Sequence, residues 1–343
     1  MATSYFLENT LDDVMHVVIE EILSRGETIY PTKGDALEIT GVLLEISDPR
    51  ARLSRTETRG RIFSGLGELL WYLSGSNEVD FVAYYVGKKY AELAEDGKVF
   101  GGYGPRLLSW KGADQSWKGV NQISNVTKIL KTKRDSRNAV IQLFDSTDLA
   151  AKHKDVPCTC TLQFMLRDGK LHLFTNMRSN DVHLGLPHDV FCFTMLQEII
   201  ANSVGADMGF YKHAVGSMHL YVKDKGPAKR FLREGFQRTA AVMQPMPKGD
   251  PWPEIARVLA AEAAIRTGSS TAASTTGMDP YWADLVRLLE VFAAKKRKDI
   301  PGIKAIGANM SNQVYVRFID RVIRKLAAAS PINPSDDKTE QEV

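Results

Sequence analysis

The sequence predicts an α+β fold that combines paired strands, a long apolar helix and further helices toward the C-terminal end. Three patterns support this prediction. Apolar residues alternate on both sides of Asp168-Gly169, which is typical of two strands joined by a tight turn with positive φ angles. Apolar residues then recur with a period of 3.6 from Val190 to Val204, which indicates a long buried helix. Beyond residue 245 the recognisable patterns are helical.

The other elements follow from the same two periods, taken in chain order. Helices are expected over 11–24, 64–74 and 120–131, and strands over 37–43, 139–144 and 210–221. Residues 97–110 contain four glycines and favour a loop or bend over regular structure. Further helices are expected over 254–266, 280–298 and 309–329.

The composition changes near residue 245, where a proline-rich stretch leads into the last helices. A linker rich in Ser, Thr, Ala and Gly separates them at 267–277. We therefore expect a main domain over 1–245, a helical extension over 246–330 and a disordered polar tail over 331–343. A basic run begins at Lys295 and ends one helix, where cations complement the helix dipole, an interpretation that is favoured over a nucleic-acid patch.

The bulk composition is that of a globular protein: 343 residues, 44% hydrophobic and 25% charged. The net charge of +3 is small for this length and does not favour an obligate nucleic-acid surface. Three cysteines, two of them one residue apart, argue against a disulfide framework and predict a cytoplasmic location, in a host cell if the chain is viral. The sequence contains no apolar run long enough to span a membrane, and no membrane partner is expected.

Candidate chemical groups gather around Cys158. The cysteine follows a proline and enters a strand in a region with several arginines, which are expected to lower its thiol pKa and favour a nucleophilic thiolate. A zinc site is the rival interpretation, but no second ligand pair occurs at zinc spacing, so no metal is expected. Arg178-Ser179 suits a phosphate, whereas Asp189 is, on local rules, a helix N-cap.

Several motifs resemble the thymidylate synthase family in order and spacing. The cysteine motif is Pro157-Cys158 followed by Gln163-Phe164, and the arginine motif is Arg178-Ser179-Asn180-Asp181. The others are Glu68-Leu69-Leu70-Trp71-Tyr72-Leu73, Asp135-Ser136-Arg137, Asp168-Gly169-Lys170-Leu171, Leu184-Gly185-Leu186-Pro187 and His219-Leu220-Tyr221. The resemblance covers about residues 11–235 and implies a large mixed sheet through which two subunits form a homodimer.

The resemblance also implies roles for individual residues in binding a pyrimidine nucleotide and the cofactor 5,10-methylenetetrahydrofolate. Cys158 would add to C6 of the base, and Glu68 and Tyr103 would handle protons. The nucleotide would be held by Arg178, Ser179, Lys33, Gln163, His219 and Tyr221, with Arg137 reaching in from the second subunit. Asp181, Gly185 and Asp155 would lie along the folate.

One departure from the family concerns the base. Thymidylate synthases have an asparagine where this chain has Asp189, and that amide pairs with N3–H and O4 of uracil. A carboxylate accepts from the N4 amino group of cytosine, and from N3 once N3 is protonated, but it offers no donor to O4 of uracil. An unpaired buried acceptor costs roughly 1–3 kcal/mol. The substitution therefore predicts a cytidine nucleotide.

Further departures concern the fate of the one-carbon unit. Thr159 replaces the histidine that follows the synthase cysteine, Asp155 brings a charge near it, and the folate-packing tryptophan is replaced by Lys89 or Tyr90. Asn138 replaces a second phosphate arginine. In having Thr159 and Asp155 at these positions, the sequence is similar to the deoxycytidylate hydroxymethylase branch of the family. A polar pocket admits water, which yields a hydroxymethyl group, whereas a dry one favours hydride transfer, which yields a methyl group.

The sequence thus predicts C5-hydroxymethylation of dCMP, with CMP as the ribose alternative. A dCMP methyltransferase that produces dihydrofolate is a second hypothesis. A third is a non-catalytic protein that binds nucleotides or nucleic acid on the same fold. The role of the helical extension, and the choice between viral DNA modification and nucleoside antibiotic synthesis, stay open at this point.

Overall fold

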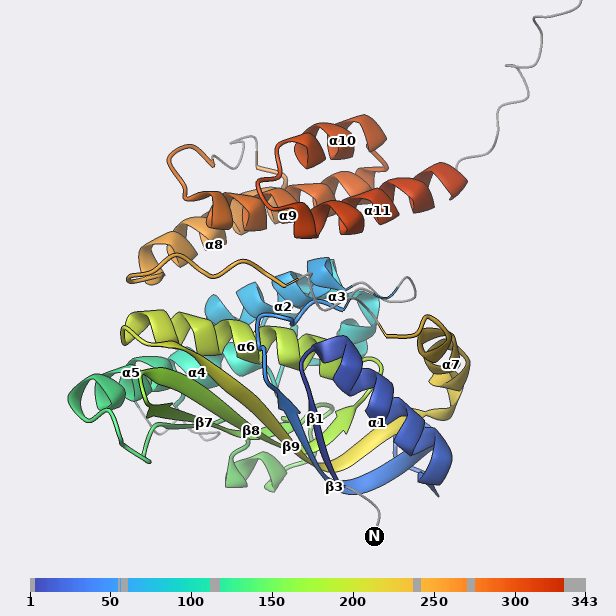
Figure 1. Ribbon diagram of the computed structural model, residues 1–343, viewed down its shortest axis with the longest axis vertical. Coiled ribbons are helices and arrows are strands. Elements are labelled where there is room, and N and C mark those ends of the chain that lie inside the picture. The colour runs from blue at the N-terminus through green and yellow to red at the C-terminus, as the bar shows by residue number, and fades with distance from the viewer. Residues whose placement is uncertain are drawn as a thin grey trace, which may run out of the picture.

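The computed structural model describes residues 4–54, 56, 61–111, 118–236, 242–269 and 275–329, with the side chains of residues 88 and 89 left out. Helices and one large sheet build the main domain, and a layer of C-terminal helices lies above it in Figure 1. The predicted tail over 331–343 lies outside the described residues. Within the described chain, no helix combines the length and apolar character needed to cross a membrane.

Seven strands of the described chain form one mixed sheet in the order β1-β3-β9-β8-β7-β6, with β2 beside β3. The pairs β1/β3 and β8/β9 are parallel and the others antiparallel. The strands are β1 (Tyr5–Glu8), β2 (Glu27–Ile29), β3 (Ala36–Ile46), β6 (Val140–Gln142), β7 (Thr159–Arg167), β8 (Lys170–Asp181) and β9 (Asp207–Tyr221). The α+β class and the large mixed sheet are confirmed.

The hairpin between β7 and β8 has the predicted turn. Asp168 and Gly169 both adopt positive φ, 48° and 74°, so the two strands pair directly up to Arg167 and Lys170. At the other end of the hairpin the register shifts between Thr159 and Thr161, a bulge of the kind that often lies beside active sites. This end of the sheet carries the cysteine and arginine motifs.

The long helix α6 (Leu186–Ser203) is buried along nearly its whole length, as predicted. Helix α1 (Leu11–Arg25) and α6 pack against the sheet, and α2 (Ile62–Leu73) lies between α6 and the C-terminal helices (Figure 1). The remaining elements of the main domain are α3 (Val79–Val86), η1 (Lys88–Leu93), β4 (Ala94–Glu95), β5 (Lys98–Val99), α4 (Tyr103–Leu108), α5 (Gln122–Thr132), η2 (Ser146–Leu149), η3 (Val222–Asp224) and α7 (Lys225–Arg233).

The helical extension comprises α8 (Trp252–Thr267), α9 (Pro280–Arg297), α10 (Ile300–Ala308), η4 (Gln313–Tyr315) and α11 (Val316–Ala329). It packs on α2 and α3: the Tyr85 hydroxyl donates to Glu262 Oε1 at 2.9 Å, in a buried contact. Lys296, from the basic run at the end of α9, lies over the Tyr84 ring and donates to the Tyr84 carbonyl oxygen at 3.0 Å. One cation of this run therefore fastens the extension to the main domain.

Two sequence predictions are wrong in part. The glycine-containing stretch 97–110 includes α4, because Arg106 forms a buried ion pair with Asp148 at 2.7 Å and thereby anchors the short helix. The stretch 309–329 is not one helix, because residues 309–312 separate α10 from η4 and α11. There the backbone N–H of Asn312 donates to Asp284 Oδ2 at 2.8 Å. Inside a continuous helix, this N–H would instead donate to a carbonyl oxygen of the preceding turn.

Candidate active site

The sheet end beside the bulge brings Cys158 and Arg178 together. The backbone N–H of Arg178 donates to the carbonyl oxygen of Cys158 at 2.9 Å, and Arg178 Nη2 lies 3.7 Å from Cys158 Sγ. The guanidinium also donates to the carbonyl oxygens of Val156 and Pro157 at 3.0 and 2.9 Å. These bonds fix the arginine beside the thiol, as the sequence predicts.

The expected effect of arginine on the thiol is outweighed by burial. Burial raises the pKa of Cys158, Arg178 lowers it, and the negative charges of Asp155 and Asp189 raise it further. The net direction is upward, so the prediction of a lowered thiol pKa is wrong for this unliganded chain. The interaction with Asp189 also shows that the thiol and this carboxylate share one region.

Tyr103 opens α4 and contacts the residue after the cysteine. Its hydroxyl donates to Thr159 Oγ1 at 2.9 Å and accepts from the backbone N–H of Thr159 at 3.1 Å. Burial raises the pKa of Tyr103 well above its usual range, with Cys158 and Asp189 adding to the effect. Tyr103 is therefore a neutral hydroxyl that can donate or accept a hydrogen bond but does not act as a phenolate.

Asp189 is not a simple helix cap. It lies in the first turn of α6, and its Oδ2 accepts from the side-chain amide of Asn180 on β8 at 2.8 Å. Burial raises the pKa of Asp189 well above its usual range, the negative charge of Glu68 raises it further, and the Asn180 hydrogen bond acts in the opposite direction. The side chain therefore keeps its proton to a higher pH than an exposed aspartate does.

Glu68 is a buried carboxylate with both oxygens in polar contact. The Tyr72 hydroxyl donates to Oε1 at 2.7 Å, and His188 Nδ1 lies 2.7 Å from Oε2. Burial acts to raise the pKa of Glu68, but the charge and hydrogen bond of His188, together with Tyr72, outweigh it and lower the pKa. Glu68 and Asp189 thus have opposite pKa shifts, an arrangement that suits one proton acceptor and one proton donor.

Asp181 ends β8 with one oxygen occupied and one free for a ligand. Oδ1 accepts from the backbone N–H groups of His183 and Leu184 at 2.8 and 3.0 Å. Oδ2 is buried and has no hydrogen-bond partner among the described residues. A Cβ on Gly185 would lie 3.5 Å from Asp189 Oδ2, so the glycine keeps the space above that carboxylate open. A buried free acceptor fits the N–H groups of a pterin ring, and these residues are compatible with a folate.

His219 and Tyr221 lie on the neighbouring strand β9 and face the same way. Their rings are 5.0 Å apart in an edge-to-face contact, and His219 pairs in register with Asp181. Burial raises the pKa of Tyr221, and Asp181 and Cys158 contribute to the shift, which places this ring near the thiol.

Lys33 and Asp155 form a polar edge near the thiol. Lys33 Nζ lies 3.9 Å from Asp155 Oδ1. Burial raises the pKa of Asp155, while Lys33 and Arg178 act to lower it. The charge that the sequence predicts near the thiol is therefore present, and it is half-buried.

Two predicted nucleotide ligands lie away from this cluster. Arg137 is exposed on the segment before β6, and Gln163 Nε2 donates to its carbonyl oxygen at 3.1 Å. Within one subunit, Gln163 therefore supports the backbone at Arg137. Ser179, next to Arg178, is half-buried on β8 and pairs in register with Ser217.

The sequence profile of the thymidylate synthase family matches residues 17–247. The chain belongs to the thymidylate synthase family. A deoxyuridylate hydroxymethyltransferase from Bacillus phage SP01 is 31% identical over 222 residues, which make up 62% of this chain and 57% of that relative. The chain thus matches a little over half the length of this relative, and the extension from α8 onward lies beyond the matched family region.

Several residues in this thymidylate synthase-type site escaped the sequence analysis. Asn180 and His188 stand inside recognised motifs, but their partners, Asp189 and Glu68, follow only from the packing of β8 and α2 against α6. Tyr90, one of the two expected replacements for the folate-packing tryptophan, lies near the site: the charge of Glu68, followed by burial, raises its pKa well above the usual range, with Asp155 contributing. The side chain of Lys89, its alternative as the tryptophan replacement, lies outside the described part.

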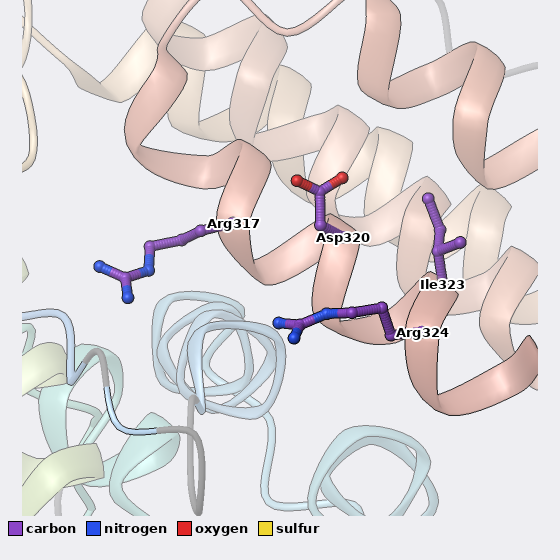
Figure 2. Close-up of a pocket in the computed structure, with 4 residues that line it drawn as sticks. All are labelled: Arg317, Asp320, Ile323 and Arg324. Atoms are coloured by element: carbon purple, nitrogen blue, oxygen red, sulfur yellow. The ribbon is translucent and has the colours of Figure 1, made fainter. Parts of the chain in front are cut away.

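A cavity of about 640 Å³ lies elsewhere, against α11. Its lining is Arg317, Asp320, Ile323 and Arg324, and Figure 2 shows the two arginines extending toward pale blue helices of the main domain. None of the candidate site residues lines it. In the described part of the chain, no group of His, Cys, Asp or Glu is arranged to hold a metal ion.

Proposed function

We propose that this chain hydroxymethylates dCMP at C5, with 5,10-methylenetetrahydrofolate as the source of the one-carbon unit. The observation that carries the proposal is Asp189, a half-buried acid of raised pKa that interacts with Cys158 and stands where synthases of the family have an asparagine. Family membership and the hydroxymethyltransferase relative support the reaction class.

The bond from Asn180 decides which oxygen of Asp189 carries the proton. Because Oδ2 already accepts from the Asn180 amide, a proton on the carboxyl resides on Oδ1. Oδ1–H then donates to N3 of cytosine, and Oδ2 uses its second lone pair for the N4 amino group. Transfer of the proton to N3 gives a charge-assisted pair and makes C6 more electrophilic toward the Cys158 thiolate. Cytosine can therefore form a pair between its protonated N3 and the carboxylate, which uracil cannot form because its N3 already carries a hydrogen.

The chain's own residues account for the remaining steps. Cys158 Sγ, as the thiolate, forms a bond to C6, which turns C5 into a nucleophilic carbon. Methylenetetrahydrofolate, when bound, supplies a carbon at the oxidation level of formaldehyde. Asp181 Oδ2 and the open space at Gly185 would hold its pterin ring. Glu68, kept ionised by His188, accepts the proton lost from C5.

The polar lining of the site favours addition of water to the new one-carbon group over transfer of hydride to it. The Tyr90 phenol lies where the charges of both Glu68 and Asp155 act on it, whereas a dry apolar wall would favour hydride transfer. We therefore expect tetrahydrofolate, not dihydrofolate, as the second product. Accumulating dihydrofolate, detected by its absorbance, would instead support the methyltransferase alternative.

The direct experiment incubates the purified chain with methylenetetrahydrofolate and dCMP, CMP or dUMP and identifies products by mass. We expect 5-hydroxymethyl-dCMP to form fastest. Cys158→Ala should abolish turnover while dCMP binding by calorimetry persists. A methylated product, exclusive use of dUMP, or turnover by Cys158→Ala each contradicts a stated part of the proposal.

Hydroxymethylation of dUMP is the second candidate, and the named activity of the phage relative favours it. A neutral Asp189 also has one donor and one acceptor, as an amide does, so it can pair with O4 and N3–H of uracil. The two candidates differ in pH dependence: the uracil pairing needs the proton to stay on Asp189, whereas the cytosine pairing persists after the proton moves to N3.

We also propose that the active form is a homodimer in which Arg137 serves the partner's site. The exposure of Arg137 within one subunit supports the idea. Mixing the inactive variants Cys158→Ala and Arg137→Ala should restore about a quarter of wild-type activity, because half the dimers are mixed and each has one intact site. A mixture that stays inactive after subunit exchange would rule out the crossing.

A further inference from the structure

A chain of buried polar side chains runs from strand β9 to Asp189. The Tyr211 hydroxyl lies 2.6 Å from His213 Nδ1, and the other ring nitrogen, Nε2, lies 3.4 Å from the amide nitrogen of Asn180. That amide nitrogen donates in turn to Asp189 Oδ2 at 2.8 Å. Asn180 and His213 are only 3% and 0% exposed, so these contacts lie in a medium of low dielectric constant, where an unpaired donor is costly.

The sulfur of Met177 decides which end of the Asn180 amide faces Asp189. Nδ2 of Asn180 lies 2.9 Å from Met177 Sδ. A thioether sulfur carries no proton and can only accept, so the amide atom beside it is the nitrogen and not the oxygen. One N–H of the amide therefore serves Asp189, and the other serves Met177 and His213 together. Asn180 Oδ1 has no hydrogen-bond partner among the described residues.

His213 must accept a hydrogen bond from this amide. Burial lowers the pKa of His213 to about 3, so near pH 7 the ring is neutral and carries one proton. Because Nε2 faces an amide N–H, that proton resides on Nδ1 and is donated to the Tyr211 oxygen. The side chain of Thr175 interacts with the Tyr211 phenol and has no other partner among the described residues, so Thr175 Oγ1 can accept from the phenol.

The orientation of the Asn180 amide bears on the choice of base. As it stands, an N–H points at Asp189 Oδ2, and the carboxyl proton resides on Oδ1, the oxygen that donates to N3 of cytosine in the proposed pairing. With the amide oxygen turned toward Asp189, Oδ2 would carry the proton, and Oδ1 would be a bare acceptor. A bare Oδ1 repels the bare N3 of cytosine but accepts from N3–H of uracil.

We propose that His213, held by Tyr211, is a positioning residue that fixes the Asn180 amide and thereby sets the preference of Asp189 for cytosine over uracil. The inference rests on the proposed function, in which Asp189 pairs with the base. His213 acts through Asn180 and does not touch the nucleotide. Its contribution should therefore appear in the ratio of the activities with dCMP and dUMP, and not in the steps that both substrates share.

Three variants test the chain. His213→Phe keeps a ring but removes the acceptor for Asn180, Tyr211→Phe removes the hydroxyl that holds Nδ1–H, and His213→Gln keeps an amide oxygen that can accept. The readout is kcat/KM with dCMP divided by kcat/KM with dUMP. We expect this ratio to fall about tenfold in His213→Phe, the effect of losing one hydrogen bond, less in Tyr211→Phe and least in His213→Gln.

Gln197→Leu is the matched control for lost packing. Gln197 on α6 is as buried as His213 and bonds the same two strands, since its Nε2 donates to the carbonyl oxygens of Leu171 and Phe210 at 2.9 and 3.1 Å. Its replacement should lower the unfolding temperature and leave the ratio unchanged. A ratio that falls equally in Gln197→Leu would show that the effect comes from packing, and it would overturn the inference.

A second measurement needs no turnover. In protein labelled with ¹⁵N at histidine, the His213 signals are assigned by their loss in His213→Phe. We expect a proton on Nδ1 and a bare Nε2, with the same pattern from about pH 5 to 8, because this range lies above the pKa of the ring. A proton on Nε2 overturns the inference, whatever the substrate.

The outcomes separate this inference from the proposed function. Where turnover is absent, the same ratio is taken from the affinities for dCMP and dUMP, measured by calorimetry. A ratio that His213→Phe leaves unchanged contradicts the inference. The expected ¹⁵N pattern with a falling ratio, in a wild type that prefers dUMP or forms no hydroxymethylated product, contradicts the proposed function alone. A wild type that binds neither nucleotide contradicts both.

Discussion

Helix α6 carries two carboxylates in different surroundings, the half-buried Asp189 in its first turn and the buried Glu198 in its last third. Glu198 is bonded to Arg52 and Arg50 and accepts from the backbone N–H of Met246 at 3.1 Å. Burial acts to raise its pKa, but the two arginines outweigh burial and lower it. Asp189 has one neutral amide donor and a second acid nearby, and its pKa is raised.

The difference separates a carboxylate paired within the protein from one that has no cation beside it among the described residues. Both oxygens of Glu198 have donors within the protein, and the bond from Met246 ties the cluster to the segment that leads into the helical extension. Asp189 has no cation in contact among the described residues, so a bound base can supply the partner that the protein withholds. Removal of one partner from a buried pair leaves a charge that destabilises the fold, whereas a carboxyl without a cation beside it can take its partner from a ligand.

The largest expected effect is a loss of stability when the pairing of Glu198 is broken. Arg52→Leu leaves Glu198 with only the partly exposed Arg50, and loss of one partner from a buried pair costs about 3–5 kcal/mol. Urea unfolding should show the loss, while base preference in the folded fraction stays unchanged. The double variant Arg52→Leu/Glu198→Met should recover part of it, since apolar replacement of both partners removes the orphaned charge. A loss below about 1 kcal/mol would contradict this account of the cluster.

The next effect is a change in base preference when Asp189 is replaced. Asp189→Asn presents a fixed donor and acceptor that match uracil, and one mismatched buried hydrogen bond changes relative kcat/KM about ten- to a hundredfold. We expect the preference to shift from dCMP toward dUMP, with little change in unfolding free energy below about pH 4, where Asp189 carries its proton in both the folded and the unfolded chain. The matched change Glu198→Gln should reduce stability and leave the preference alone. Equal shifts in both variants would show that the two ends do not differ as described.

Local sequence patterns predicted the secondary structure better than the properties of the candidate site residues. The Asp168-Gly169 turn and the long helix were predictable because positive φ and a 3.6 period are properties of short stretches. Helix α4 was missed because its anchor, the Arg106–Asp148 pair, joins segments 42 residues apart. The family resemblance located Cys158 and Asp189, but the direction of the Cys158 pKa depends on burial, which only the packed structure determines.

The smallest effect is a difference in how stability depends on pH. The folded pKa of Asp189 is raised, so its contribution is present below the unfolded pKa of about 3.9 and is lost as pH rises through the folded value. Glu198 has a lowered pKa, so its contribution is present above about pH 4.3 and is lost as pH falls through the folded value.

A pKa that differs by one pH unit between the folded and unfolded chains changes the unfolding free energy by about 1.4 kcal/mol, so measurements across this pH range should resolve the two ends. Asp189→Asn should remove part of the fall in unfolding free energy as pH rises. Glu198→Gln should remove part of the fall in unfolding free energy as pH is lowered. Curves that stay parallel to the wild type would mean that neither carboxyl changes its pKa on folding. If only Glu198→Gln departs, Asp189 is ionised in the free protein, and the proton on N3 of cytosine must come from solvent.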